Sequence, residues 1–140
     1  MIFQSMITAI IEKLQETVNP YWIIVFGSTA EGRERDDSDI DIAYLSDIKL
    51  GNYKRFLLAQ ELADIVHRDV DLVDLSEAST VFQAQIIHTG KTIFCSDEER
   101  KTIFEMKTLK MYSKLNEERK IIFEDIKKRG SIYEERSNFE

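Results

Sequence analysis

The sequence contains few of the residues that form cross-links and linkers. Its 140 residues include one cysteine, one proline and five glycines. Cys95 has no second cysteine with which to form an internal disulfide, and neither repeats nor low-complexity segments are present. Residues 1–12 lack the basic leader of a secretory signal, and no uncharged run reaches the roughly 18 apolar residues of a membrane helix. We therefore expect one cytoplasmic domain without a membrane span.

Acidic residues outnumber basic ones, and the excess is unevenly distributed along the chain. The chain has 26 acidic and 19 basic residues, for a net charge of −7. Residues 97–140 contain 11 of each sign, so the whole excess of negative charge belongs to residues 1–96. Non-specific binding to DNA or RNA depends on neutralising phosphates with Lys and Arg. A long nucleic-acid substrate is therefore not expected.

Hydrophobic periodicity predicts alternating helices and strands. Apolar residues at helical spacing predict three helices, and short apolar or alternating runs predict four strands. The helices are expected over 4–17, 52–67 and 77–88, and the strands over 21–26, 39–45, 70–75 and 91–95. This order predicts a fold of the α+β class that resembles α/β folds, in which a sheet of about four strands is flanked by helices.

The last third of the sequence predicts one long helix. Ser96 and Glu99 have the spacing of a capping box, and the helical pattern continues to Gly130. We therefore divide the chain into a core over 1–96, a helix over 97–130 and a tail over 131–140. The helix has more large apolar residues than one stripe requires. It is expected to pack on its own core or to bind another chain, a partner or a second copy.

The most informative residues are Gly27-Ser28 and, ten residues later, Asp39-Ile40-Asp41. A glycine at the end of a strand allows close backbone approach, and the Ser28 hydroxyl and the following amides suit a triphosphate. Asp39 and Asp41 alternate with Ile40 on a strand, so both carboxylates face the same side. Carboxylates in this arrangement suit Mg²⁺, and two such ions would support an in-line displacement at phosphorus.

A third carboxylate would complete the metal site or accept the proton of an attacking hydroxyl. Asp69 and Asp71 share one parity on the third strand, while Asp74 has the opposite parity and should point away. Either Asp69 or Asp71 could therefore be the third carboxylate, and Asp71 lies further inside the strand.

The stretch Phe26–Asp41, FGSTAEGRERDDSDID, resembles the signature of the DNA-polymerase-β-like nucleotidyltransferase superfamily. The segments VDLVDLSEASTV, IIHTGKTIF and MYSKLNEER also resemble the minimal nucleotidyltransferase (MNT) antitoxins that pair with HEPN toxins. The resemblance covers nearly the whole chain. It implies the fold of that superfamily, a mixed sheet that carries three carboxylates, with Mg²⁺ as cofactor and ATP as cosubstrate. It further implies transfer of AMP to a tyrosine hydroxyl of a HEPN ribonuclease, which would neutralise the toxin.

The resemblance also implies roles for individual residues. Gly27 and Ser28 would hold the triphosphate, and Asp39 and Asp41 would bind the metal. Asp71 matches the third carboxylate, which belongs to the metal site and assists deprotonation. Glu31 stands where many relatives carry a basic residue, so Arg33 or Arg35 would neutralise the phosphates.

Two alternatives remain open. The acidic first 96 residues would suit a cationic small molecule of the aminoglycoside type as acceptor. The chain could also neutralise a partner by binding alone, with its long helix in a groove of that partner.

Overall fold

The computed structural model describes residues 4–27 and 38–137, with side chains up to residue 129. Four strands form one mixed sheet in the order β3-β2-β1-β4. They are β1 (Trp22–Phe26), β2 (Ile40–Leu45), β3 (Val70–Asp74) and β4 (Lys91–Cys95). β2 pairs parallel with β3 and antiparallel with β1, and β1 pairs antiparallel with β4. The expected mixed four-stranded sheet is confirmed.

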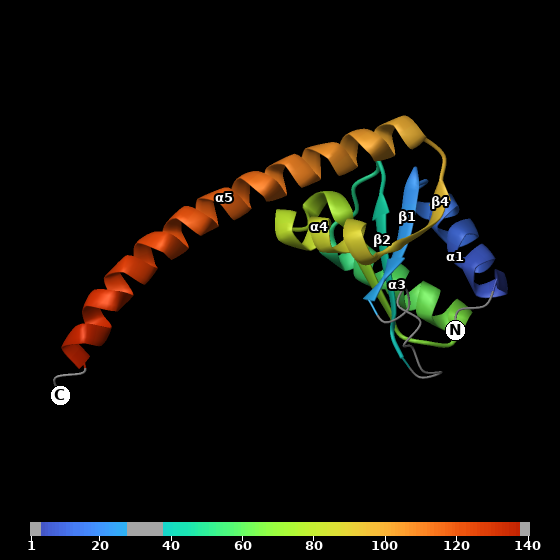
Figure 1. Ribbon diagram of the computed structural model, residues 1–140. Coiled ribbons are helices and arrows are strands. Elements are labelled where there is room, and N and C mark those ends of the chain that lie inside the picture. Colours follow the sequence, from blue (N-terminus) through green and yellow to red (C-terminus); the bar gives the residue numbers. More distant parts are fainter. Residues whose placement is uncertain (1–3, 28–37, 138–140) are drawn as a thin grey trace.

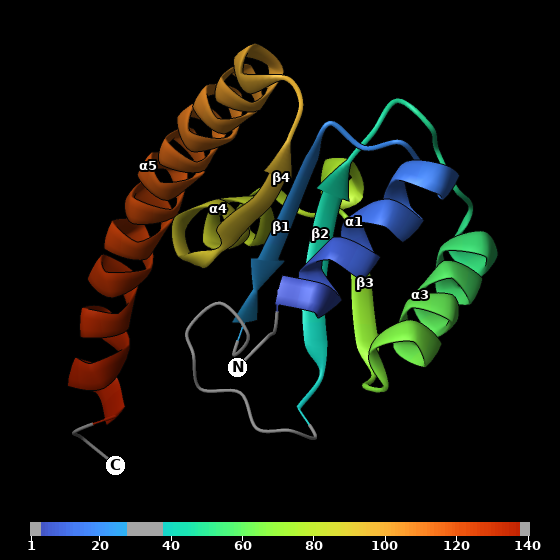
Figure 2. The same cartoon turned by 90° about the vertical axis from the view of Figure 1, so that its right-hand side faces the viewer.

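Helices cover both faces of this sheet (Figures 1 and 2). α1 (Gln4–Thr17) and α3 (Asn52–Val66) lie on one face. α4 (Thr80–Thr89) and the first half of α5 (Glu98–Ser137) lie on the other. None of the described helices is long and apolar enough to cross a bilayer.

The alternation of β2 separates the two cores. Ile40, Ile42 and Tyr44 are fully buried against α1 and α3, while Ala43 and Leu45 are buried with Ile86 of α4. Because successive side chains of a strand point to opposite faces, Asp41 lies on the α4 side, with Ala43. The expected faces of this strand are therefore confirmed.

The C-terminal helix begins and ends differently from the prediction. The N-cap is Asp97, whose Oδ1 accepts a hydrogen bond from the Arg100 amide at 3.0 Å. Ser96 instead donates its amide to the Tyr21 carbonyl at 2.9 Å and ends the sheet. The helix also continues through Gly130 to Ser137, so most of the expected tail is helical. One glycine costs a helix only about 1 kcal/mol, and the residues on both sides favour helix.

Another boundary also differs from the sequence prediction. The helix expected over 77–88 starts at Thr80, because Ser79 caps it and accepts from the Phe82 amide at 3.2 Å. The preceding residues Leu75–Glu77 form a short 3-10 turn. Asp74 caps this turn by accepting from the Ser76 amide at 3.0 Å.

The first half of α5 packs against the body of the molecule. Phe104 lies edge-on to Trp22 with ring centroids 6.3 Å apart, and Thr108 is buried. Arg100 lies over the Tyr21 ring at 3.9 Å and binds Asp47 at 2.7 Å, which holds the helix start against the sheet. From residue 116 to residue 129 every side chain is exposed, and this half projects away from the sheet (Figure 1).

Candidate functional site

Gly27 ends β1 in a conformation that favours glycine. Its φ is +65°, in the left-handed region that side-chain-bearing residues rarely adopt. A Cβ at this position would lie 3.2 Å from Cγ of Asp41 and would overlap its Oδ2. The backbone therefore approaches the Asp41 carboxylate at a distance that only glycine permits.

Asp41 lies in the middle of the candidate site. In the sheet register it pairs with Phe26 of β1 on one side and with Asp71 of β3 on the other. Neighbouring strands are about 4.8 Å apart, so Asp41 and Asp71 extend from adjacent positions on one face. The carboxyl end of β1 and the amino ends of β2 and β3 therefore meet on the same side of the sheet, where these strands begin or end (Figure 2). We call this row of strand ends the catalytic edge.

The carboxylates at this edge repel one another. Partial burial raises the pKa of Asp41 to about 6, and the negative charges of Asp71 and then Asp39 add to the increase. Asp39 immediately precedes β2 and is exposed, as is Asp71. Because these three carboxylates repel one another, a cation bound beside them would be stabilised.

The donor set suits a hard divalent cation bound in part by substrate. Among residues 4–27 and 38–129, no group of three His, Cys, Asp or Glu side chains is placed so that it could hold a metal ion by itself. Mg²⁺ does not require one, because it commonly takes one or two carboxylates and completes its shell with water and phosphate oxygens. Asp39 and Asp41, with Asp71 beside them, are the oxygen donors that fit this ion.

Several predicted residues lie outside the described part of the chain. Ser28, Glu31, Arg33 and Arg35 all belong to residues 28–37, so their expected roles toward the triphosphate stay predictions. Asp69 lies just before β3, and its carbonyl accepts the Ile40 amide at 2.9 Å.

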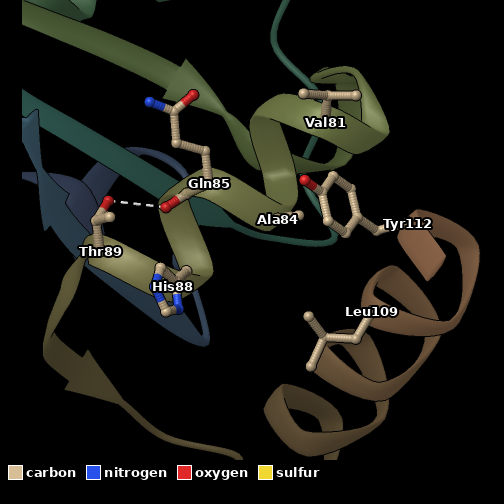
Figure 3. Close-up of a pocket in the computed structure, with 7 residues that line it drawn as sticks. All are labelled: Val81, Ala84, Gln85, His88, Thr89, Leu109 and Tyr112. Carbon is tan, nitrogen blue, oxygen red and sulfur yellow. Dashed lines mark hydrogen bonds between the residues drawn. The ribbon is translucent and has the colours of Figure 1, made fainter. Parts of the chain in front are cut away.

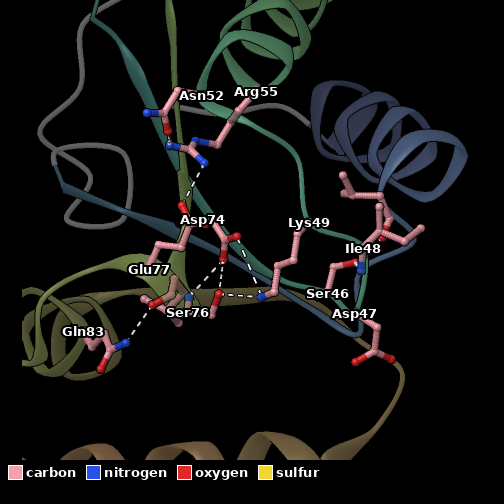
Figure 4. Close-up of polar contacts among 12 residues, drawn as sticks. Ser46, Asp47, Ile48, Lys49, Asn52, Arg55, Asp74, Ser76, Glu77 and Gln83 are labelled. Atoms are coloured by element: carbon pink, nitrogen blue, oxygen red, sulfur yellow. Dashed lines mark hydrogen bonds and ion pairs between the residues drawn. The ribbon is translucent and has the colours of Figure 1, made fainter.

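Asp74 points away from the catalytic edge, as its parity predicts. It is 3% exposed and belongs to a polar cluster at the other end of β2 and β3 (Figure 4). Its Oδ1 accepts from the Ser76 hydroxyl at 2.7 Å, and Lys49 lies 4.0 Å from its Oδ2. Burial, together with the charge of Asp74, raises the pKa of neighbouring Tyr44 to about 12. This cluster caps a turn and does not contribute to the candidate site.

A pocket of about 470 Å³ lies between α4 and α5 (Figure 3). It is lined by Val81, Ala84, Gln85, His88 and Thr89 of α4 and by Leu109 and Tyr112 of α5. No sequence pattern indicated this pocket. Its two walls come from separate helices, and no motif marks their contact.

One wall of the pocket, α4, also contacts the end of β1 through other residues. α4 ends at Thr89, and a Cβ on the next residue, Gly90, would lie 3.2 Å from the Val25 carbonyl. At the other end of α4, Phe82 packs edge-on against Phe26 with ring centroids 5.7 Å apart. Both contacts reach the last residues of β1, immediately before Gly27.

Comparison with known proteins decides the family. The family model described as polymerase beta, nucleotidyltransferase matches residues 8–99. The chain belongs to this nucleotidyltransferase family. Its resemblance to that superfamily is thereby confirmed, as is the expected fold.

Relatives with known activity are also similar to the chain. It is 40% identical over 118 residues to protein adenylyltransferase MntA of Shewanella oneidensis, covering 84% of each chain. A toxin–antitoxin crystal structure with AMP-PNP superimposes with a TM-score of 0.77 at 39% identity, covering 86% of this chain and 97% of that one. A chain in the solved structure of a tri-AMPylated S. oneidensis HEPN toxin in complex with an MNT antitoxin also matches, at 37% identity and a TM-score of 0.74. The match covers 88% of this chain and 97% of that one.

Proposed function

We propose that this nucleotidyltransferase transfers AMP from ATP to a tyrosine hydroxyl of a HEPN ribonuclease toxin and thereby neutralises it. The observation that carries the proposal is the placement of Asp41 between Gly27 and Asp71 at one edge of the sheet. The adenylyltransferase relative and the AMPylated HEPN complex support the choice of donor and acceptor.

The geometry supports an in-line displacement. In the proposed reaction the acceptor oxygen attacks the α-phosphorus of ATP, the bond to the bridging oxygen breaks and pyrophosphate leaves. Asp71, exposed beside Asp41, would accept the hydroxyl proton. The Gly27 backbone and Ser28 would bind the triphosphate.

Asp39 and Asp41 would hold Mg²⁺, with Asp71 completing the carboxylate set. When bound, Mg²⁺ neutralises the phosphate charge that develops during displacement. The repulsion that raises the pKa of Asp41 would be relieved in that state.

Intact mass spectrometry tests the function. The chain is incubated with the HEPN protein encoded beside it, ATP and Mg²⁺, and both masses are recorded. Wild type should add one or more AMP groups to the partner, whereas Asp39→Ala with Asp41→Ala should add none. Glu16→Ala with Asp64→Ala is the matched control, because it removes two exposed carboxylates from α1 and α3.

The possible outcomes separate the alternatives. If wild type does not change the partner's mass, protein adenylylation by this chain is wrong. Full neutralisation by the Asp39/Asp41 variant would instead indicate an antitoxin that acts by binding. Modification of a cationic small molecule without modification of the partner would favour the aminoglycoside-type alternative.

A further inference from the structure

The turn between α3 and β3 is held in place at the catalytic edge (Figure 2). The last turns of α3 are anchored in the core by the buried residues Leu62 and Val66. His67 then adopts a left-handed conformation with φ of +56°, which ends the helix and turns the chain toward β3. The Arg68 amide donates to the Ala63 carbonyl at 3.3 Å. The backbone of Arg68 is therefore fixed by the end of the helix.

Two hydrogen bonds from this turn hold the peptide groups on either side of Asp39. The Arg68 Nε donates to the Ser38 carbonyl at 2.9 Å, and this carbonyl belongs to the peptide group that precedes the Asp39 Cα. The Asp69 carbonyl accepts the Ile40 amide at 2.9 Å, and this amide belongs to the peptide group that follows it. Because each peptide group is planar, fixing both of them sets the direction in which the Asp39 side chain leaves the backbone.

Asp39 depends on such contacts more than the other two carboxylates do. Asp41 and Asp71 lie inside strands that pair with each other, so the sheet fixes their backbone. Asp39 is exposed and precedes the first pair of that ladder, Ile40 with Val70. The hydrogen bond from Arg68 extends the order of the sheet by one peptide group, to the first of the proposed metal ligands.

We propose that Arg68 is a positioning residue for the metal site, which holds the Ser38–Asp39 peptide group so that the carboxylates of Asp39 and Asp41 face the same ion. This inference rests on the proposed function, in which these two carboxylates bind Mg²⁺. It adds a residue that acts on the ion through its ligand. Removing a group that orients a metal ligand commonly lowers metal affinity or activity by about 10- to 100-fold.

The surroundings of Asp41 indicate that Arg68 acts through the backbone rather than through its charge. The charges that shift the pKa of Asp41 are those of Asp71 and Asp39, and both raise it. A guanidinium close to this carboxylate would lower its pKa. Loss of the hydrogen bond to Ser38 is therefore the change that matters to the site.

The test compares Arg68→Met with Arg68→Lys in the full-length chain. Methionine keeps an unbranched side chain but cannot donate a hydrogen bond, whereas lysine keeps both a donor and the charge. Arg55→Met is the matched control. Arg55 is also a half-buried arginine, but its guanidinium binds Glu77 and Asn52, which are not part of the candidate site (Figure 4).

Metal binding is measured separately from activity. Mn²⁺ alone serves as the probe, because it is bound by the same kinds of oxygen ligand as Mg²⁺ and its free form can be quantified by electron paramagnetic resonance. AMP transfer to the neighbouring HEPN protein is then recorded as a function of Mg²⁺ concentration. Both measurements are repeated at a temperature well below the melting point of every variant.

Arg68→Met should bind Mn²⁺ at least about 10-fold more weakly than wild type. It should need correspondingly more Mg²⁺ for half-maximal transfer, while its KM for ATP at saturating Mg²⁺ stays near the wild-type value. Arg68→Lys should recover part of the affinity, and Arg55→Met should bind Mn²⁺ as wild type does. In an Asp39→Ala background, Arg68→Met should cause no further loss of Mn²⁺ affinity, because the ligand that it positions is absent.

Other results would overturn the inference. Wild-type Mn²⁺ affinity in Arg68→Met would do so and would leave the proposed function intact. An equal loss in Arg55→Met would show that both changes act through general stability, and a further loss in the Asp39→Ala background would show that Arg68 acts on another group. Wild type that binds no Mn²⁺ would overturn the inference and the proposed metal site together. The expected Mn²⁺ affinities without AMP transfer by wild type would support the role of Arg68 and refute the proposed function alone.

Discussion

Gly27 and Asp41 are packed so closely that the glycine backbone occupies the space beside the carboxylate. A Cβ on Gly27 would overlap Oδ2 of Asp41 and lie 3.2 Å from its Cγ, and the backbone there has φ of +65°. Gly27→Ala should therefore displace Asp41 and strain the turn. Because misplacing a reacting group by about 1 Å can cost 10²-fold in rate, we expect AMP transfer to fall about 100-fold. Gly51→Ala is the matched control, since a Cβ there meets nothing within 4 Å.

Loss of the proposed metal ligand should abolish transfer without unfolding the chain. Asp41→Asn keeps the shape of the side chain but removes its charge, and Mg²⁺ binding requires that charge. We expect a decrease in transfer of at least about 100-fold, with circular dichroism unchanged. Asp64→Asn, on the exposed side of α3, should retain full activity. Wild-type rates in Asp41→Asn would contradict the proposed role.

The raised pKa of Asp41 links the stability of the fold to pH. Its folded pKa of about 6 lies above the usual value of 3.8, so folding is opposed by its ionisation. The stability that this group contributes is fully present below about pH 4 and is lost as the pH rises through 6. Because Asp41 is only half-buried, solvent screening reduces the penalty to about 1 kcal/mol. In urea titrations without Mg²⁺, Asp41→Asn should be more stable than wild type at pH 8 and equal to it at pH 4.

Magnesium should reverse that penalty. A cation that binds the native carboxylates and not the unfolded chain stabilises the fold by an amount that rises with the logarithm of its concentration above the dissociation constant. Adding Mg²⁺ with a non-hydrolysable ATP analogue at pH 8 should therefore raise the melting temperature of wild type, but not that of Asp39→Ala with Asp41→Ala. Equal increases in both proteins would show that the ion binds elsewhere.

The N-cap of α5 provides a test of local structure. Asp97 accepts the Arg100 amide at 3.0 Å, so Asp97→Ala should destabilise the protein by about 1 kcal/mol. Ser96→Ala should have little effect, because Ser96 contributes its backbone amide to the sheet. Denaturant titration of both variants distinguishes this arrangement from the capping box that the sequence suggested.

The sequence predicted the sheet well because its strands carry strong local patterns. The alternation from Asp39 to Leu45 indicated which side chains of β2 face each core, and parity alone separated Asp71 from Asp74. Strand order, by contrast, depends on long-range pairing that no local pattern records. That Asp71 lies directly opposite Asp41 became visible only from the β2–β3 register.

Helix ends and the α4–α5 pocket were harder to predict. Ser96 and Asp97 are both good capping residues, and the choice between them depended on the pairing of Ser96 with Tyr21 across the sheet. Leu109 and Tyr112 resemble ordinary residues of an amphipathic helix. Only their position across from α4 makes them part of a pocket.

The projecting half of α5 has a consequence for hydrogen exchange. Residues 116–129 are exposed on every side, and an isolated helical segment of about this length is only marginally stable in water. Their amides should exchange far faster than those near Phe104 and Thr108, which the core protects. A molecule that covered residues 116–129 would slow the exchange of these amides, although the helix would keep the same conformation.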